Sequence, residues 1–469
     1  MNNVIAILDI GKTNKKLFLF DDQYKLVWEQ SEVCEQTTDE DGEPCEDIQR
    51  LTEWVHRSLA KLTTLEDFSV KAINFSAYGA SFVYIGEDKT AIAPLYNYLK
   101  AYPEALKKKF YTTYGGEITF SMLTASPVLG SLNSGMQLYR VKATQPDLFG
   151  KIQYALHLPQ YLSFLLTGQP SSDITSIGCH TNLWNFSQQH YHEWVYREGI
   201  IDKLAPIMPS TSVLPVQIAS PANAGTDSPA WPASGGPAIS GIGLHDSSAA
   251  MIPYLESFRE PFLLISTGTW CISMNPFNDS PLTVAELQRD CLCYMTYQGR
   301  PVKASRLFAG YEHEQQVQRL AAHFLTSTAR AGDVSFDPDC VARLRSRNEQ
   351  QAGNDNITPV TASVFHQRAL NNFGSFEEAY HQLMLDIMDQ QIISTRLVLH
   401  DTDVRRIFVD GGFGRNQLYM HLLAEAFPGI EVFTASIPQA TAMGAALAIH
   451  RHWNSRPMPG DIIELKYYK

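Results

Sequence analysis

The chain has 469 residues and is too long for one hydrophobic core, because single cores stop growing at about 250–300 residues. Hydrophobic residues make up 44% and charged residues 18% of the sequence, as in a soluble globular enzyme and unlike a disordered chain. The formal net charge of −12 argues against a nucleic-acid partner, because phosphate backbones bind basic surfaces. A nucleotide ligand is still allowed, since backbone N–H groups, Mg²⁺ and one or two cations can meet its few charges.

Neither a targeting segment nor a membrane span is expected. The first residues lack the basic start, the long apolar stretch and the small-residue cleavage site of a secretory signal. No run of about 18 apolar residues occurs. The seven cysteines are scattered without a CxxC pair, which indicates reduced thiols in a cytoplasmic compartment. Cys291 and Cys293 are the one close pair, and we expect them on a strand.

The first half of the chain opens with a predicted strand–turn–strand. Residues 4–8 are apolar, residues 9–14 are rich in turn formers, and residues 16–20 resume an apolar strand. The later elements of this half are, in order, a solvated acidic loop at residues 39–41, a strand at 71–75 that runs into Ser76-Ala77-Tyr78-Gly79, and a helix at 158–167 that Gly168 ends.

The second half opens with the same design. Residues 261–265 are apolar, Ser266-Thr267-Gly268-Thr269 forms a turn, and residues 270–274 return as a strand. Two similar hairpins indicate an internal duplication, with a lobe boundary near residue 250. The remaining elements are a strand at 405–409 that ends in Asp410-Gly411-Gly412-Phe413-Gly414, a helix at about 416–427, and a helix at 441–450 whose small residues allow a neighbour to pack closely.

The first turn invites comparison with a nucleotide P-loop, which it is not. The P-loop needs a glycine at position 6, where this chain has alanine, and a helix after the turn, where this chain has a strand. A strand–turn–strand can still offer backbone N–H groups to phosphate oxygens. Asp9 would then hold Mg²⁺ through water, and the candidate phosphate ligands are Gly11, Lys12, Thr13, Asn14 and Lys16. The alternative for this turn taken alone is a plain surface hairpin.

Two glycine turns in the second half extend this hypothesis. Thr267, Gly268 and Thr269 offer hydroxyls and amides in the same setting, and two such turns facing each other across a cleft would grip one polyphosphate. Gly411-Gly412 lies between a strand and a helix, but position 417 is glutamine, so the GxGxxG dinucleotide fingerprint is not met. Paired glycines would let an adenine or ribose approach the backbone, with Asn416 as a hydrogen-bond partner. A simple strand–helix turn is the alternative.

The stretch from Gly241 to Ala250 carries the strongest catalytic candidate. Small residues lead to His245-Asp246, and Ser-Ser-Ala-Ala then begins a helix. Asp246 is either a helix N-cap or a carboxylate that takes a proton from a substrate hydroxyl as the hydroxyl attacks phosphorus, and the two roles can coexist.

In the same order along the chain, these motifs resemble the FGGY family of carbohydrate kinases. Asp9-Ile10-Gly11-Lys12-Thr13-Asn14-Lys15-Lys16 is similar to the first phosphate motif, Asp-x-Gly-Thr/Ala-Ser/Thr-x-x-Arg/Lys, and Thr267-Gly268-Thr269 is similar to the second. Gly411-Gly412 with Asn416 resembles the adenosine motif, and Gly444-Ala445-Ala446 resembles the helix that follows it. His245-Asp246 stands where the family has its catalytic Asp. Its His, like Ser266-Thr267-Gly268-Thr269-Trp270, is similar to the rhamnulokinase/fuculokinase-like branch.

The resemblance implies an α/β protein of two RNase-H-like lobes, the actin/Hsp70-like ATPase fold, with an interlobe cleft that closes over sugar and MgATP. Residues 1–245 would form the sugar-binding lobe and residues 246–469 the nucleotide-binding lobe. Asp246 would act as general base while the γ-phosphate of ATP passes to a hydroxyl of a small sugar, a ketose such as rhamnulose, fuculose or xylulose. The oligomeric state is left open, with a homodimer as one option.

Two departures from the family pattern concern the substrate. Position 12 is lysine where the family has a small residue, so Lys12 either contacts phosphate or points outward. The Trp-x-Asp-x-Arg sugar-binding segment is replaced by Pro94-Leu95-Tyr96-Asn97-Tyr98-Leu99-Lys100, in which Asn97 and Lys100 are candidate replacements. The expected sugar contacts are Tyr78, Gly79, Asn97 and His245.

Two rival functions use the same fold. One is a regulator that binds sugar or nucleotide without turnover, against which the intact Asp9 and Asp246 argue. The other is an ATPase that needs no sugar, against which the aromatic and polar segment at residues 76–200 argues. Release of ADP in the presence of a sugar panel separates both rivals from a kinase.

Overall fold

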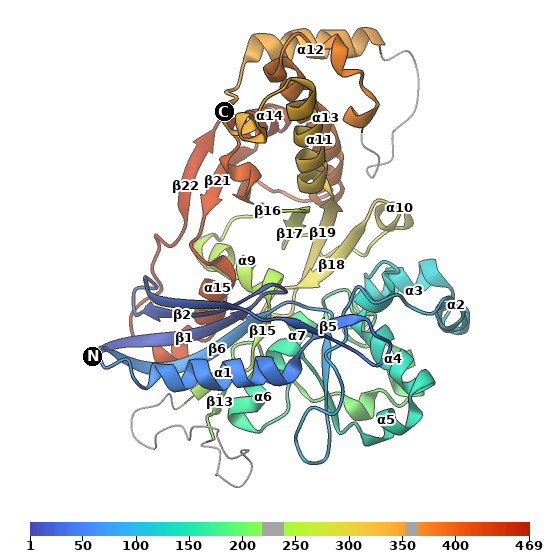
Figure 1. Cartoon of the computed structure of the whole chain (residues 1–469), viewed down its shortest axis with the longest axis vertical. Helices are drawn as coiled ribbons and strands as arrows, with labels where there is room; N and C mark the ends of the chain where they lie inside the picture. The colour runs from blue at the N-terminus through green and yellow to red at the C-terminus, as the bar shows by residue number, and fades with distance from the viewer. Residues whose placement is uncertain (218–238, 352–363) are drawn as a thin grey trace. The chain divides into compact units, whose positions relative to one another are not determined.

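A computed structural model describes residues 1–217, 239–351 and 364–469 (Figure 1). The chain divides into two compact units. Unit 1 contains Met1–Ser257, Cys293–Pro301 and Pro438–Ile462, and unit 2 contains Phe258–Leu292, Val302–Ile437 and Ile463–Lys469. None of the helices in the described ranges is long and apolar enough to cross a membrane.

The chain first passes from unit 1 to unit 2 after Ser257. The cause is helix α9 (Asp246–Ser257), which packs within unit 1 against helix α15 (Ala440–Ala448) from the end of the chain. A Cβ on Gly444 would come within 1.8 Å of the carbonyl oxygen of Ala249, so only glycine allows this approach. The close packing expected of this small-residue helix is therefore confirmed.

Unit 1 is built on a mixed sheet whose described strands run in the order β13-β14-β6-β1-β2-β3, with β15 also paired to β6. β2 runs antiparallel to β1, and β6 runs parallel to it. These strands are β1 (Asn2–Ile10), β2 (Asn14–Asp21), β3 (Leu26–Val33), β6 (Phe68–Ala77), β13 (Val213–Pro215), β14 (Ile239–Gly241) and β15 (Leu244–His245).

The two faces of this sheet have different covers. Helices α1 (Ile48–Leu62) and α6 (Leu158–Thr167) pack on the face that carries Val4, Ala6 and Leu8 (Figure 1). Since side chains alternate along a strand, Asp9 belongs to the opposite face, where α15 contacts β1 and β6. Helix α6 ends at Gly168 in the left-handed conformation, as expected from the sequence.

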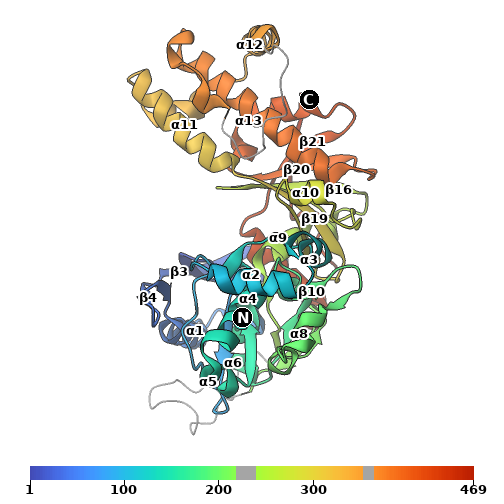
Figure 2. The same ribbon diagram turned by 90° about the vertical axis from the view of Figure 1, so that its right-hand side faces the viewer.

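A second cluster of unit 1 is rich in aromatic side chains. Phe110 contacts the rings of Phe120, Tyr139 and Trp194 edge-on. Its elements, several of which are visible in Figure 2, are β7 (Phe82–Ile85), β8 (Tyr154–His157), α2 (Glu104–Thr113), α3 (Glu117–Thr124), α4 (Ser134–Thr144), α5 (Pro146–Lys151) and α8 (Glu193–Arg197). Shorter elements of unit 1 are β4 (Gln36–Thr38), β5 (Pro44–Glu46), β9 (Ser172–Asp173), α7 (Ile174–Ile177), β10 (Trp184–Asn185), β11 (His190–Tyr191), β12 (Ile207–Met208) and α16 (His450–Trp453).

The acidic loop at residues 39–41 differs from its prediction. Asp39 is only 7% exposed, and its carboxylate accepts a hydrogen bond of 2.5 Å from Lys100 Nζ. Asp41 pairs with the same ammonium at 2.6 Å and remains exposed. The expectation of a solvated loop is thus wrong for Asp39, because a lysine distant in sequence covers and neutralises it.

Unit 2 repeats the arrangement of unit 1. Its sheet runs β18-β19-β17-β16-β20-β21-β22 through the described residues. β17 is antiparallel to β16 and β20 is parallel to it, as β2 and β6 are to β1, which confirms the repeated hairpin design. The strands are β16 (Phe262–Thr267), β17 (Cys271–Asn275), β20 (Arg406–Gly411), β21 (Glu431–Ser436) and β22 (Glu464–Tyr468), together with β18 (Cys291–Met295) and β19 (Pro301–Leu307), of which residues 293–301 are assigned to unit 1.

One face of the unit 2 sheet carries the main helices. Leu263 and Ile265 of β16 and Val409 of β20 share a core with them. Figure 2 shows α11 beside α13, which agrees with their contacts. The helices of this core are α11 (Ala309–His323), α12 (Pro338–Gln351), α13 (Phe376–Leu399) and α14 (Gln417–Ala426), and the short helix α10 (Val284–Leu287) lies outside it. The predicted strand for Cys291 and Cys293 is confirmed, with both residues buried.

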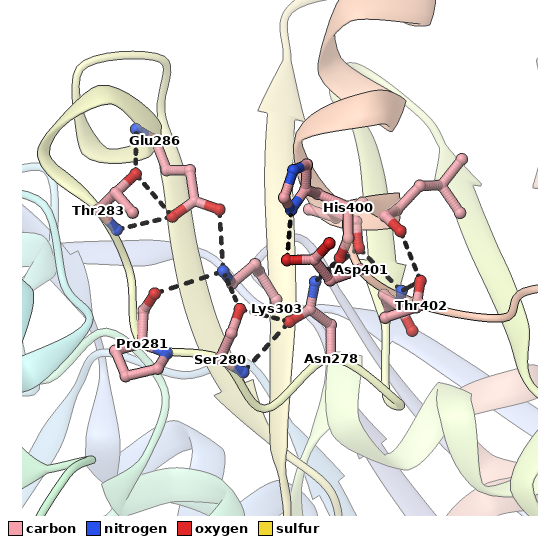
Figure 3. A network of polar contacts seen from close by, with 12 residues as sticks. Asn278, Ser280, Pro281, Thr283, Glu286, Lys303, His400, Asp401 and Thr402 are labelled. Carbon is pink, nitrogen blue, oxygen red and sulfur yellow. Dashed lines mark hydrogen bonds and ion pairs between the residues drawn. The ribbon is translucent and has the colours of Figure 1, made fainter.

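A polar network secures the loop that carries α10 (Figure 3). Lys303 of β19, with a 2% exposed side chain, donates to Ser280 Oγ at 2.7 Å and to Glu286 Oε1 at 2.8 Å. Glu286 and Thr283 also form a capping box at the start of α10. Asn278 donates to the carbonyl oxygens of Val398 and His400. The loop is therefore tied both to the sheet and to the end of α13.

Candidate functional site

The turn between β1 and β2 is held from within unit 1 by a buried lysine. Lys15 Nζ donates to the carbonyl oxygens of Gly11 at 2.9 Å and of Lys12 at 3.3 Å. Its side chain is 1% exposed and forms an ion pair with Glu46 of β5. The hydroxyl of Tyr78 donates to the other oxygen of Glu46 at 2.8 Å. This network fixes the backbone of the turn, while Thr13 and Asn14 remain exposed.

Lys15 was not among the residues selected from the sequence, although a signal for it existed. It has the same strand parity as Leu17 and Leu19, which belong to the core on one face of the sheet. Lys16 points to the other face, where its ammonium lies 5.9 Å from the ring centre of Phe18. Strand alternation therefore separates the two lysines.

Asp9 lies at the end of β1, opposite Ser76 of β6 in the strand register. Its Oδ2 accepts a hydrogen bond of 2.8 Å from the hydroxyl of Thr441, at the start of α15. Burial, and to a smaller extent the charge of Asp246, raises the pKa of Asp9 to about 6. The negative charge of this carboxylate is thus poorly solvated, as at a site that receives a cation.

Asp246 begins helix α9 and keeps part of its side chain open. Its Oδ1 accepts a hydrogen bond of 2.6 Å from the backbone N–H of Ser247, and its side chain is 32% exposed. Burial of the carboxylate raises its pKa to about 6. This bond reaches the next residue, whereas an N-cap side chain bonds the second or third N–H beyond it, and the role of Asp246 as a base stays a prediction.

His245 is fixed on three sides next to Asp246. Its Nε2 lies 3.2 Å from Cys179 Sγ in a hydrogen bond and 3.2 Å from Asp246 Oδ1, and its backbone N–H donates to Thr175 Oγ1 at 3.0 Å. The ring stacks on Tyr294 with centres 5.8 Å apart. Burial lowers the pKa of His245 to about 4, so the imidazole is neutral at physiological pH.

Two of the expected sugar contacts, Gly79 and Asn97, also contact other residues of unit 1. A Cβ on Gly79 would lie 2.8 Å from His245 Cδ2, so glycine makes room for that ring. Asn97 donates from Nδ2 to the carbonyl oxygen of Pro44 at 3.1 Å and accepts from the N–H of Leu99 at 3.0 Å. Together with the pairing of Lys100 to Asp39, these contacts hold the loop at residues 94–100 in place.

Tyr98 in this loop is a further candidate that the sequence reading omitted. The charge of Asp246 is, after burial, the largest cause of the raised pKa of Tyr98, so the phenol lies near the proposed base. Tyr78 and Tyr98 meet edge-on with ring centres 5.9 Å apart, and the ammonium of Lys12 lies over both rings. Lys12, expected at phosphate, thus extends over two tyrosines.

The backbone of the turn between β16 and β17 is held by hydroxyl and backbone contacts within unit 2, and Arg306 lies over the ring of Trp270 at 5.2 Å. The hydroxyl of Thr267 donates to the carbonyl oxygen of Asp410 at 2.6 Å and accepts from the N–H of Phe413 at 3.0 Å. A Cβ on Gly310 of α11 would come within 1.8 Å of the carbonyl oxygen of Gly268. The N–H of Tyr311 donates to the carbonyl oxygen of Thr269 at 3.1 Å. The turn and the start of α11 are therefore packed backbone to backbone.

The glycine pair after β20 lies beside this turn. Gly411 has φ +92°, and a Cβ on it would meet the carbonyl oxygen of Thr267 at 1.9 Å. A Cβ on Gly412 or on Gly268 would meet nothing within 4 Å, so both backbones have open space in front of them. Asn416 caps α14 by accepting from the N–H of Tyr419 at 3.1 Å, and its Nδ2 donates to the hydroxyl of Tyr380 at 2.7 Å.

The candidate residues therefore form two groups, one in each unit. Unit 1 brings together Asp9, the turn at residues 11–16, Tyr78, Gly79, His245 and Asp246. Unit 2 brings together Thr267, Gly268, Thr269, Gly411, Gly412 and, through Tyr380 and α14, Asn416. Asn97 lies in the loop at residues 94–100, which the Tyr78–Tyr98 ring contact joins to the first group.

Two family models and a curated relative align with most of the chain. Residues 4–226 match the N-terminal domain of the FGGY family of carbohydrate kinases, and residues 259–335 match the C-terminal domain of carbohydrate kinase FGGY. A curated rhamnulokinase from Halalkalibacterium halodurans is 23% identical over 96% of this chain and 93% of its own length.

Solved structures show the same fold. A carbohydrate kinase from Novosphingobium aromaticivorans aligns with a TM-score of 0.79 at 23% identity, over 99% of this chain and 94% of that one. A ligand-bound xylulose kinase from Lactobacillus acidophilus aligns with a TM-score of 0.77 at 18% identity, over 99% of this chain and 93% of that one. The predicted fold class, the two-lobe α/β fold of actin/Hsp70-like ATPases, is confirmed.

Proposed function

Because the chain belongs to the FGGY family of carbohydrate kinases, we propose that it transfers the γ-phosphate of ATP to a hydroxyl of a small ketose, with Asp246 as the general base. The observation that carries this proposal is the state of Asp246. It is a desolvated carboxylate at the start of α9, still 32% exposed, beside a neutral His245 and within reach of the charge of Asp9.

In this proposal Asp246 accepts the proton of the attacking hydroxyl. The oxygen of that hydroxyl forms a bond to the γ-phosphorus, the bond from phosphorus to the β–γ bridging oxygen breaks, and ADP leaves with that oxygen. A carboxylate with a pKa of about 6 is mostly ionised at neutral pH and is a stronger base than an ordinary aspartate. His245, fixed by Cys179 and Thr175, is a positioning residue for the carboxylate.

Asp9 is the proposed holder of Mg²⁺, through water. Its buried, poorly solvated carboxylate suits a divalent cation, which prefers oxygen ligands. Bound Mg²⁺ would neutralise phosphate charge. Thr441 fixes the carboxylate by its hydrogen bond, so that the charge of Asp9 keeps one position.

Backbone groups are the proposed phosphate and nucleoside ligands. The amides of the turn at residues 11–14 and Lys16 would bind phosphate from unit 1, and the amides and hydroxyls of Thr267, Gly268 and Thr269 would do so from unit 2. The open backbone at Gly268 and Gly412 supports this assignment, because a ligand can approach it closely. Gly411, Gly412 and Asn416 would border the adenosine, which makes unit 2 the nucleotide-binding unit and unit 1 the sugar-binding unit.

The ketose assignment has narrower support. His245-Asp246 and the Ser266 to Trp270 segment are similar to rhamnulokinases, and a curated rhamnulokinase aligns with nearly the whole chain. A ketose of the rhamnulose, fuculose or xylulose type is therefore the proposed acceptor class.

The test is replacement of the base. Asp246→Asn is expected to lower kcat for ADP release with a responsive ketose by at least about 100-fold, because a positioned base contributes that much or more. The exposed Asp403→Asn is the matched control and should keep full activity. Activity of Asp246→Asn within a few-fold of wild type would reject Asp246 as base. ADP release that does not depend on any sugar would reject the kinase assignment itself.

The raised pKa of Asp246 predicts how both kcat and the stability of the fold change with pH. Since the base works when ionised, wild-type kcat should fall as the pH falls through about 6. Stability changes in the opposite direction. The pKa of Asp246 is raised in the folded state, so the folded state binds more protons than the unfolded state between the ordinary value of 3.8 and about 6. The contribution of Asp246 to stability therefore falls as the pH rises through that window. Asp246→Asn should therefore melt at a higher temperature than wild type at pH 7.5, and a lower melting temperature would contradict the desolvation argument.

A further inference from the structure

Lys12 is a half-buried cation without a carboxylate partner among the described residues. Its ammonium lies 5.5 Å from the ring centre of Tyr78 and 5.1 Å from that of Tyr98. Glu46 is the carboxylate that acts on it most strongly, but the two oxygens of Glu46 are taken by Lys15 and the hydroxyl of Tyr78. Cation–π contacts contribute about 0.5–2 kcal/mol and replace a lost hydration shell only in part. The ammonium therefore keeps donors for a further anion.

The charges around Lys12 do not balance. Lys12 and Lys15 carry two positive charges and Glu46 carries one negative charge. Burial raises the pKa of Cys45, Tyr78 and Tyr98, so the thiol and both phenols are neutral at physiological pH. The cluster formed by Lys12, Lys15, Glu46, Tyr78 and Tyr98 thus has one positive charge in excess, in a region where desolvation already lowers the pKa of Lys12.

The position of this excess charge favours the acceptor over the nucleotide. Tyr98 connects Lys12 with Asp246. Its ring centre lies 5.1 Å from the ammonium of Lys12, and the charge of Asp246 contributes, after burial, to the raised pKa of its hydroxyl. Lys16, in contrast, acts on Asp9 and lies over Phe18, on the opposite face of the hairpin from Lys15. The hairpin therefore has Lys16 on the side of Asp9 and Lys12 on the side of Tyr78 and Tyr98.

We propose that Lys12 binds a carboxylate on the acceptor, so that the ketose phosphorylated by this chain is a keto sugar acid and not a neutral ketose such as rhamnulose, fuculose or xylulose, with Tyr78 and Tyr98 forming the wall that positions the ammonium. This inference rests on the proposed function, because it takes Asp246 as the group that holds the reacting hydroxyl. A hydroxyl at Asp246 and a carboxylate at Lys12 place the acceptor along Tyr98. A neutral ketose in the same place would leave the ammonium without a partner.

The experiment uses acceptor pairs that differ only in one terminal group. Tagaturonate and fructuronate carry a carboxylate where tagatose and fructose carry a hydroxymethyl group. The expected kcat/KM is at least about tenfold higher for the acid of each pair, because a hydrogen bond to a charged group contributes about 1.5–3 kcal/mol. Lys12→Gln should remove this preference by raising KM for the acid, while KM for ATP stays within about twofold, and Lys12→Arg should retain much of it. The exposed Lys71→Gln, which removes the same charge from β6, is the matched control.

Each other outcome is decisive. A preference for the neutral sugars that Lys12→Gln leaves unchanged overturns the inference, and so does a rise in KM for ATP that is equal for all acceptors, which would assign Lys12 to phosphate. In both cases Asp246-dependent transfer would persist, so the proposed function would stand. If no acceptor in the panel supports ADP release, calorimetric titration of the chain with each acid still tests the site: binding of an acid that Lys12→Gln weakens about tenfold supports the inference, and its absence overturns it.

Discussion

The two hairpin turns occupy equivalent places in the two units and are fixed by opposite means. In unit 1 the turn after β1 is held by the buried ammonium of Lys15, which bonds two turn carbonyl oxygens and pairs with Glu46. In unit 2 no buried ion pair bonds the backbone of the turn after β16 in the described residues, and the guanidinium of Arg306 contacts the turn only over the ring of Trp270, 5.2 Å from its centre. This turn is held by the hydroxyl of Thr267 and by glycines at positions 310 and 411 that let backbones touch.

The difference teaches where each turn is vulnerable. A turn fixed by a buried ion pair depends on both charges, because a single charge left in a low-dielectric interior is costly. A turn fixed by glycine contacts depends on the absence of side-chain volume, because close-packed backbones cannot make room for a Cβ. Unit 1 should therefore respond to loss of charge, and unit 2 to gain of volume.

The largest effect is expected from Lys15→Met in unit 1. The change leaves Glu46 buried without its cation, so the free energy of unfolding of unit 1 should fall by about 3–5 kcal/mol in chemical denaturation. The same substitution at the exposed Lys71 of β6 should change it by less than about 0.5 kcal/mol. A Lys15→Met variant as stable as Lys71→Met would break the comparison.

Adding Glu46→Gln to Lys15→Met sharpens this result. The double variant buries no unpaired charge and should recover most of the lost stability. It should still transfer phosphate poorly, because the carbonyl oxygens of Gly11 and Lys12 lack their donor and the turn is no longer fixed. Full recovery of activity would show that the turn needs no support from Lys15.

The intermediate effect is expected from Gly411→Ala in unit 2. The left-handed backbone costs an alanine about 1–2 kcal/mol, and its Cβ would also displace the carbonyl oxygen of Thr267. Thermal unfolding should show this loss, and KM for ATP should rise while KM for the sugar is unchanged. Gly412→Ala is the matched variant, since its Cβ meets nothing and its φ is −61°. It should keep wild-type stability, and equal stability of the two variants would contradict the volume argument.

The smallest effect is expected from Asn416→Ala. Loss of the cap of α14 should cost about 1 kcal/mol of unfolding free energy. Asn416→Asp keeps the acceptor for the N–H of Tyr419 and loses only the donor to Tyr380, so its cost should be smaller. Ser375→Ala, at the cap of α13, is the control for a cap loss without a nucleotide role. If all three variants have the same KM for ATP, Asn416 has a structural role only.

Much of the local structure could be predicted because it follows from short-range patterns. The apolar runs of β1, β2 and β16, separated by turn formers, identified both hairpins, and Gly168 ended α6 where expected. The acidic loop was mistaken at Asp39, because its partner Lys100 is 61 positions away. The contacts of Gly79 with His245 and of Asn97 with Pro44 could not be predicted either, since nothing near these residues in sequence indicates those neighbours.

The sequence by itself determined the two strand–turn–strand units, the glycine turns and the acid at the start of a helix, because turn chemistry and residue periodicity act within a few residues of chain. Only the tertiary structure decided which lysine supports the first turn, which one faces two tyrosines, and which glycines let distant backbones or side chains pack closely. These outcomes depend on strand register and on contacts between distant segments, where burial and charge pairing are decided by neighbours that no local pattern contains.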